Sequence, residues 1–230
     1  MRLLARRGAG TYAGNRRPPD GRPRPGAGDG DMFGRLFRRK PADAGRAAGE
    51  AAGPEADEVP ELVAVDLVRI GGPPELDFLL IGVPAVDIHR ALDGWVWIGL
   101  GGLTAVSVSA FGEIFFRDEA GRIVQLDTIE GRLRPVADSL AAFTAMLQET
   151  EARDDLLLGG FVIAAREQGL LLDEGECYDF VVAPVVGGEM SAAAMQKLSF
   201  VIKLHLAGQL HEQVKDLPPG TPITGFSIAD

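Results

Sequence analysis

Few side chains in this sequence are suited to covalent chemistry. Its 230 residues include a single cysteine, Cys177. A cysteine nucleophile requires a histidine and an orienting carboxylate or amide that the fold brings to it. Cys177 instead stands in an apolar run just before Tyr178 and Phe180, which is typical of an inert core residue. Because one cysteine forms no internal disulfide, the composition indicates a reduced, intracellular protein.

The three histidines are the next candidates, as metal ligands. His205 and His211 lie six residues apart on a predicted helix, so they are rotated by about 240° from one another around its axis. His89 is distant in sequence, and a single cysteine excludes a Cys-rich zinc knuckle. The glycines of 99–102 do not fit the phosphate-binding pattern Gly-x-Gly-x-x-Gly. We therefore expect no metal and no cofactor.

Carboxylates are the third possibility. Asp118, Glu119 and Asp127 flank one predicted hairpin, where two of them would suit acid–base chemistry or a cation. Side chains at such turns usually accept hydrogen bonds from their own backbone instead. With no catalytic constellation left, we predict that the protein is not an enzyme. A small enzyme that uses Cys177 or these carboxylates is the weaker alternative.

The elements that position these residues are clearest between 113 and 136. Two runs of β-forming residues, 113–117 and 122–127, are joined by a four-residue loop that ends in Gly121. Glycine supplies the positive φ that closes such a loop. A turn over 128–131 leads to a third strand over 132–136. The pattern predicts an antiparallel meander.

Helices and further strands are expected to follow. Asp138 or Ser139 is placed to cap a helix with one apolar stripe over 140–147. The other predicted elements are buried strands within 95–111, a helix over 154–168 ending at Gly169, strands over 170–172 and 177–182, a loop over 187–189, a helix over 195–215 and a closing strand over 223–228. Together they predict the α+β class, an antiparallel sheet packed against helices.

The chain is predicted to divide near residue 58. Residues 1–57 are rich in Gly, Pro, Ala and Arg and have almost no apolar periodicity, so we expect a disordered basic tail and linker. Met32 is an alternative start. Residues 58–230 are expected to fold as one domain. The uncharged stretch 95–111 is short for a membrane span and contains several Gly and Ser residues, so no transmembrane segment is predicted.

Charge is distributed unevenly along the chain. Residues 1–40 contain 11 Lys and Arg and three Asp, a balance of +8, whereas residues 41–230 contain 12 basic and 30 acidic residues, a balance of −18. An acidic surface repels phosphate backbones, so the main domain is not expected to bind nucleic acid, and a basic protein partner is favoured. Acidity that serves only solubility is the simpler interpretation.

An ordered series of short motifs runs from 110–118 through 175–178 and 187–189 to 205–218. This series resembles the C-terminal domain of type VI secretion immunity proteins, and the resemblance covers about residues 85–228. The motif residues are Phe111, Gly112, Glu113, Phe115, Arg117, Asp118, Gly121, Leu126, Asp127, Gly175, Cys177, Tyr178, Gly187, Gly188, Gly208, Gln209, His211 and Gln213. Members of the family usually carry Gly-Asp where this chain has Gly112-Glu113.

The resemblance implies an α+β domain, loosely similar to the SUKH immunity superfamily, that binds a cognate toxin in the cytoplasm and spares the producing cell. The toxin of such proteins is often a DNase effector. The motif residues are expected to act as scaffold, and the toxin-binding surface is not mapped by them. We predict an immunity protein whose acidic face occupies the basic cleft of a nuclease. The alternative is a non-enzymatic interaction or scaffold domain of the same fold with an unrelated partner.

Overall fold

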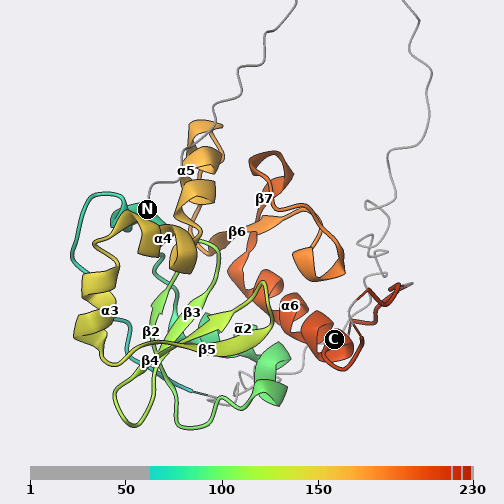
Figure 1. Ribbon diagram of the computed structural model, residues 1–230, viewed down its shortest axis with the longest axis horizontal. Helices are drawn as coiled ribbons and strands as arrows, with labels where there is room; N and C mark the ends of the chain where they lie inside the picture. Colours follow the sequence, from blue (N-terminus) through green and yellow to red (C-terminus); the bar gives the residue numbers. More distant parts are fainter. Residues whose placement is uncertain (1–62, 219, 224, 229–230) are drawn as a thin grey trace, which may run out of the picture. The chain divides into compact units, whose positions relative to one another are not determined.

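The computed structural model describes residues 63–218, 220–223 and 225–228. The predicted basic tail over 1–57 and the alternative start at Met32 lie outside these residues. Within them the chain forms two sheets and several helices, which confirms the α+β class (Figure 1). No helix of this described part is both long and apolar enough to cross a lipid bilayer.

The larger sheet has five strands in the order β1-β2-β3-β4-β5. Their bounds are Ala64–Val65 for β1, Thr104–Val108 for β2, Ile114–Arg117 for β3, Ile123–Asp127 for β4 and Arg132–Ala137 for β5. β1 is parallel to β2, and the other neighbours are antiparallel. The predicted meander over 113–136 is therefore confirmed in β3, β4 and β5.

The loop between β3 and β4 is stabilised by local interactions. The carboxylate of Asp118 accepts hydrogen bonds from the backbone N and the Nε of Arg122, both at 2.8 Å. Gly121 closes the loop with a φ of 84°, a conformation that side chains with a Cβ rarely adopt. Such short-range contacts are visible in the sequence, which is why this hairpin could be predicted.

Both faces of the larger sheet are buried. Along β3, Phe115 joins the core on one face, whereas Ile114 and Phe116 join the core on the other, as the alternation of a strand requires. A bulge in β2 between Ala105 and Ser107 inserts one residue into this alternation. The sheet thus supports two separate cores.

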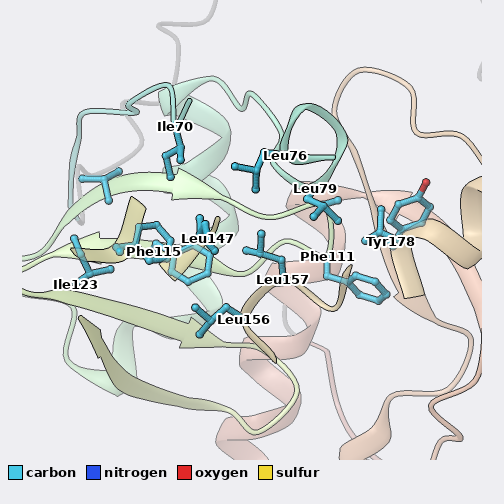
Figure 2. Close-up of a cluster of buried hydrophobic side chains, with 14 of the residues drawn as sticks. Ile70, Leu76, Leu79, Phe111, Phe115, Ile123, Leu147, Leu156, Leu157 and Tyr178 are labelled. Atoms are coloured by element: carbon cyan, nitrogen blue, oxygen red, sulfur yellow. The ribbon is translucent and has the colours of Figure 1, made fainter. Parts of the chain in front are cut away.

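Each core is closed by its own set of helices. The first is covered by α1 (Leu76–Leu79), α3 (Leu140–Met146), α4 (Thr150–Leu157) and α5 (Gly159–Glu167), and the second by α2 (Ala85–Leu92), the 3-10 helix η1 (Asp93–Ile98) and α6 (Phe200–Val214). Figure 2 shows the first core, with Leu147, Leu156 and Leu157 beside Phe115 and Ile123 of the sheet.

The predicted helix over 154–168 is wrong, because two helices occupy this part of the chain. α4 ends at Leu157, and α5 begins at Gly159. Leu158 between them has a φ of 53°, and its N–H bonds to the carbonyl of Arg153. Two glycines follow Leu158 at 159 and 160, and glycine is a weak helix former. The predicted end at Gly169 fits, since α5 ends at Glu167 and Gly169 has a φ of 79°.

The prediction of one helix over 195–215 is also wrong at its start. Met195–Ser199 is strand β7, and α6 begins only at Phe200. β7 pairs with β6 (Glu176–Phe180) in a separate antiparallel sheet, and the short 3-10 helices η2 (Pro184–Val186) and η3 (Ala192–Ala194) lie in their connection. Five residues are too few for their apolar pattern to distinguish a helix from a strand. The pairing of this segment with β6 therefore determines that it is a strand.

Three other predicted strand segments are not strands in the structure. Residues 170–172 have no strand, and the carbonyl of Leu170 accepts a hydrogen bond from the Tyr178 hydroxyl at 2.7 Å. The described residues of 223–228 form none either, and the side chain of Gln213 bonds both backbone groups of Ser227. Within 95–111, η1 takes the place of the first strand, and β2 forms as expected.

Two tryptophans explain why η1 is helical. The indole N–H of Trp95 bonds the carbonyl of Leu204 at 2.8 Å, and that of Trp97 bonds the carbonyl of Gly208 at 3.2 Å. Both acceptors lie on α6, more than 100 residues away in sequence. In a strand, Trp95 and Trp97 would also point to one face, but they would lie farther apart along the chain direction than in a helical turn. The two contacts with α6 therefore favour the tighter 3-10 turn.

η1 and α6 approach each other through two glycines. A Cβ on Gly208 would overlap the carbonyl of Gly94, and a Cβ on Gly94 would overlap the carbonyl of His205. In both cases the obstacle is backbone, which has no rotamer by which to move aside. The close crossing of η1 and α6 therefore requires glycine at both positions.

We expect Gly208→Ala to lower the free energy of unfolding by about 1 to 3 kcal/mol, because the added methyl group overpacks this crossing. Gly160→Ala is the matched control on α5, where the nearest atom to a new Cβ is Asp154 Oδ1 at 3.7 Å. That change is expected to raise stability by up to about 1 kcal/mol through helix propensity. Thermal unfolding of both variants measures the difference. Equal effects of the two changes would contradict the crossing.

Candidate functional site

A buried carboxylate, Glu113, lies at one end of the larger sheet. It directly precedes β3 and is 2% exposed. Its Oε1 accepts a hydrogen bond from the Thr128 hydroxyl at 2.7 Å, and its Oε2 accepts one from the Thr128 backbone N at 3.0 Å and one from Gln125 Nε2 at 3.3 Å. Since Thr128 follows β4, this carboxylate caps the turn between β4 and β5.

Lys203 of α6 completes the network. It is 4% exposed, and its Nζ donates to the Thr128 hydroxyl oxygen at 2.8 Å and to the carbonyl of Phe111. The Thr128 hydroxyl thus accepts from Lys203 and donates to Glu113. A buried ammonium and a buried carboxylate are linked through one hydroxyl, and this link joins α6 to two turns of the sheet.

Burial changes the proton affinity of Glu113. Loss of water around the carboxylate raises its pKa from 4.5 to about 7. The positive charge of Lys203 and the hydrogen bonds from Thr128 lower the pKa, and the negative charge of Asp127 raises it, but burial is the largest effect. Proton uptake by Glu113 is therefore coupled to folding near neutral pH.

The network reaches the surface at a hollow of about 260 Å³. Arg134 stands at its wall, with Nε 2.7 Å from Gln125 Oε1 and Nη1 3.5 Å from Asp155 Oδ2. Arg132 and Arg134 share the lining with the carboxylates Glu113, Asp127, Glu130 and Asp155. Both arginines pair with Asp127 at 4.0 Å, and Arg134 also pairs with Asp155 and holds Gln125.

The histidines do not converge on one point. His211 is buried, with Nε2 3.0 Å from the carbonyl of Thr128 and its ring 5.6 Å from that of Trp95. Burial lowers the pKa of His211, which favours the neutral ring. His205 instead contacts Gln209 on the same helix, at 2.7 Å. No cluster of His, Cys, Asp and Glu in the described ranges has the arrangement of a metal site.

Cys177 is a core residue. It is fully buried, and loss of water raises the pKa of its thiol to about 12. A thiol with so high a pKa carries almost no thiolate at neutral pH, and the thiolate is the reactive form. The structure therefore gives Cys177 the character of an inert apolar side chain.

The loop carboxylates also act locally. Asp118 binds Arg122, and Asp127 Oδ1 accepts hydrogen bonds from the backbone N of Ile129 at 3.2 Å and of Glu130 at 3.0 Å. Glu119 lies exposed at the tip of the hairpin. These side chains shape the turns on either side of β4, as expected of turn residues.

Most of the other predicted motif residues lie in turns or in the cores. The buried ones are Phe111, Phe115, Leu126 and Tyr178. A positive φ is found at Gly112, Gly175 and Gly187, and Gly188 packs against the backbone of Val182. Arg117 forms an ion pair with Asp66 at 3.2 Å, and Gln213 binds Ser227. Of the whole motif, only Glu113 and His211 bond directly to Thr128. The assignment of these residues to a motif stays a prediction.

Sequence reasoning missed four members of the network, namely Lys203, Thr128, Gln125 and Arg134. Their partners are distant, since Lys203 and Phe111 are 92 residues apart. One signal was available, because Lys203 stands among apolar residues next to Phe200 and Leu204 of the same helix. A lysine on an apolar helix face requires a buried partner or a path to water.

A comparison with family models finds a match in the C-terminal part of the chain. Residues 137–211 match the family described as T6SS immunity protein Tdi1, C-terminal. Over this segment the chain is similar to the type VI secretion immunity family. The segment covers α3, α4, α5, the β6–β7 sheet and most of α6. The match is narrower than the expected 85–228, and the motif residues between 111 and 127 precede it.

The chain is also similar to solved structures. The crystal structure of Atu4351 from Agrobacterium tumefaciens is similar with a TM-score of 0.37 and 16% sequence identity, over 57% of this chain and 67% of that chain. No curated protein matches this chain.

We expect Glu113→Gln to flatten the pH dependence of stability. Folded Glu113 keeps its proton up to about pH 7, whereas the unfolded chain releases it near pH 4.5. The stabilisation is full below pH 4.5 and is lost as the pH rises toward 7, by about 3 kcal/mol in total. Denaturant unfolding between about pH 5 and pH 8 should show this loss in the natural protein and not in the variant.

Glu119→Gln is the control for this experiment, since Glu119 is an exposed carboxylate of the adjacent hairpin. It is expected to keep the slope of the natural protein. A Glu113→Gln variant with that same slope would show that Glu113 ionises normally in the folded protein.

Proposed function

We propose that this protein is an immunity protein that binds a toxin of type VI secretion in the cytoplasm of the producing cell and blocks it by stoichiometric occlusion. The observation that carries the proposal is the match of residues 137–211 to the Tdi1 immunity family. We further propose that the toxin is a nuclease with a basic substrate-binding cleft.

The charge of the domain supports a basic partner. Residues 63–228 contain 23 Asp and Glu and 11 Lys and Arg. Opposite potentials on two proteins accelerate their encounter and orient them before contact. A surface that binds nucleic acid is positively charged, so an acidic protein competes with nucleic acid for the cleft of a nuclease.

The state of the interior also supports binding rather than catalysis. Glu113, Lys203 and Thr128 use their polar atoms on each other and on the backbone. Cys177 has a pKa of about 12 and is sealed from solvent. Groups that are committed to structure in this way lack the access to substrate that a reacting group requires.

The test is inhibition, by the purified full-length protein, of a type VI effector encoded in the same genome. The toxin alone should degrade plasmid DNA, and an equimolar amount of this protein should stop the degradation, because occlusion is stoichiometric. Degradation that continues in the presence of excess protein would overturn the immunity function. A toxin that binds this protein but leaves DNA intact would overturn the nuclease assignment alone.

Salt dependence tests the electrostatic part of the mechanism. Raising the salt from about 50 to 500 mM shortens the Debye length from roughly 14 to 4 Å, so we expect the affinity for the toxin to fall by about tenfold or more, mainly through slower association. Surface plasmon resonance measures both rate constants. An association rate that does not change with salt would contradict steering by the acidic surface.

A further inference from the structure

A second hollow, of about 330 Å³, lies between two segments of the chain. One consists of residues within and just after α1, and the other is the turn that precedes β6. Its floor and walls include the apolar side chains of Phe78, Leu172 and Tyr178, and its charged lining consists of Asp77, Asp173, Glu174, Glu176 and Arg166. The lining thus combines apolar side chains with four carboxylates and one cation. This combination fits a side chain that has an apolar stem and a positive end.

The acidic turn is fixed in place by its own hydrogen bonds. Glu176 Oε2 accepts from the backbone N of Asp173 at 2.8 Å, the backbone N of Glu176 bonds the Asp173 carbonyl at 3.1 Å, and Gly175 has a φ of 78°. Because hydrogen bonds join Asp173 and Glu176 in both directions, the carboxylates of this turn are held in place. Little conformational entropy is then lost when a ligand binds there.

The same residues already bind cations from within the chain. Lys197 Nζ lies 2.9 Å from Asp173 Oδ2 and 2.6 Å from Glu176 Oε2. The guanidinium of Arg166 lies 4.5 Å from the ring centroid of Phe78, a cation–π contact. The walls of this hollow therefore have the two features by which proteins hold Lys and Arg side chains, paired carboxylates and an aromatic face.

Two lining carboxylates are left without an internal cation. Asp77 and Glu174 are exposed, and neither side chain forms a hydrogen bond or ion pair with another described residue. One lies on α1 and the other on the turn before β6, and both line the hollow. A cation beside them would gain charge pairing without breaking an existing ion pair.

We propose that this hollow binds an arginine or lysine side chain presented by a protein partner, with the aliphatic stem on the apolar lining at Leu172 and the charged end beside Asp77 and Glu174. The identification of that partner with the toxin rests on the proposed function. A neighbouring hollow of about 360 Å³ shares Asp77, Leu80, Ile81 and Gly82 with this one. It provides space for the residues that flank the basic side chain.

The first experiment needs no toxin. The full-length protein is titrated with the peptide acetyl-Leu-Arg-Leu-amide, and backbone amide shifts are followed by NMR. We expect saturable shifts at residues 77–83 and 172–178, and none there with acetyl-Leu-Glu-Leu-amide. Absence of saturable shifts at these residues would overturn the proposal, as would equal shifts with both peptides.

A pair of isosteric changes then tests the two carboxylates. Asp77→Asn with Glu174→Gln is expected to weaken peptide binding by about three- to tenfold, because each exposed pair contributes modestly. Asp138→Asn with Glu151→Gln is the matched control, since both residues are exposed and neither lines the hollow. Equal affinity of the two double variants would overturn the role of Asp77 and Glu174.

The toxin experiment separates this site from the proposed function. If the natural protein inhibits the toxin, the Asp77 and Glu174 double variant should bind that toxin more weakly than the control double variant does. Normal inhibition by both variants would overturn the site and leave the immunity function intact. Failure of the natural protein to inhibit, with peptide binding preserved, would overturn the immunity function and leave the site intact.

Discussion

Burial of Lys203 beside Glu113 is the constraint on which the arrangement of the second core depends. Each charge is costly to remove from water, and loss of one partner from such a buried pair typically costs about 3 to 5 kcal/mol. The fold meets this cost by placing the Thr128 hydroxyl between them and the Phe111 carbonyl beside the ammonium. These bonds tie α6 to the sheet, and the same helix crosses η1 at Gly208, where a Cβ would overlap the Gly94 carbonyl.

The polar groups of the interior stabilise the fold, whereas those of the surface are accessible to a partner. The buried network, His211 and Cys177 face inward and are occupied by contacts within the fold. The carboxylates of the surface are more numerous than the cations that could neutralise them. An excess of negative charge at the surface suits binding to a basic partner, as the proposed function requires.

The parts of this structure that the sequence predicted depend on short-range signals. The β3–β4 hairpin has its turn chemistry at Asp118 and Gly121, and the helix over 140–146 has its cap at Ser139, whose Oγ accepts from Ala142 N at 3.1 Å. Strand β7 and the position of Lys203 depend on partners that are distant in sequence. No local pattern encodes such partners, so the buried network and the acid-lined hollow appear only in the folded chain.

The most direct test of this account is a double-mutant cycle between Lys203→Met and Glu113→Gln, measured by denaturant unfolding of the full-length protein at about pH 8. If the two groups are linked through Thr128, the single changes are not additive, and the double variant should be more stable than their sum predicts by about 1 to 3 kcal/mol. Additive effects to within about 0.5 kcal/mol would contradict the central claim that this network fixes α6 on the sheet.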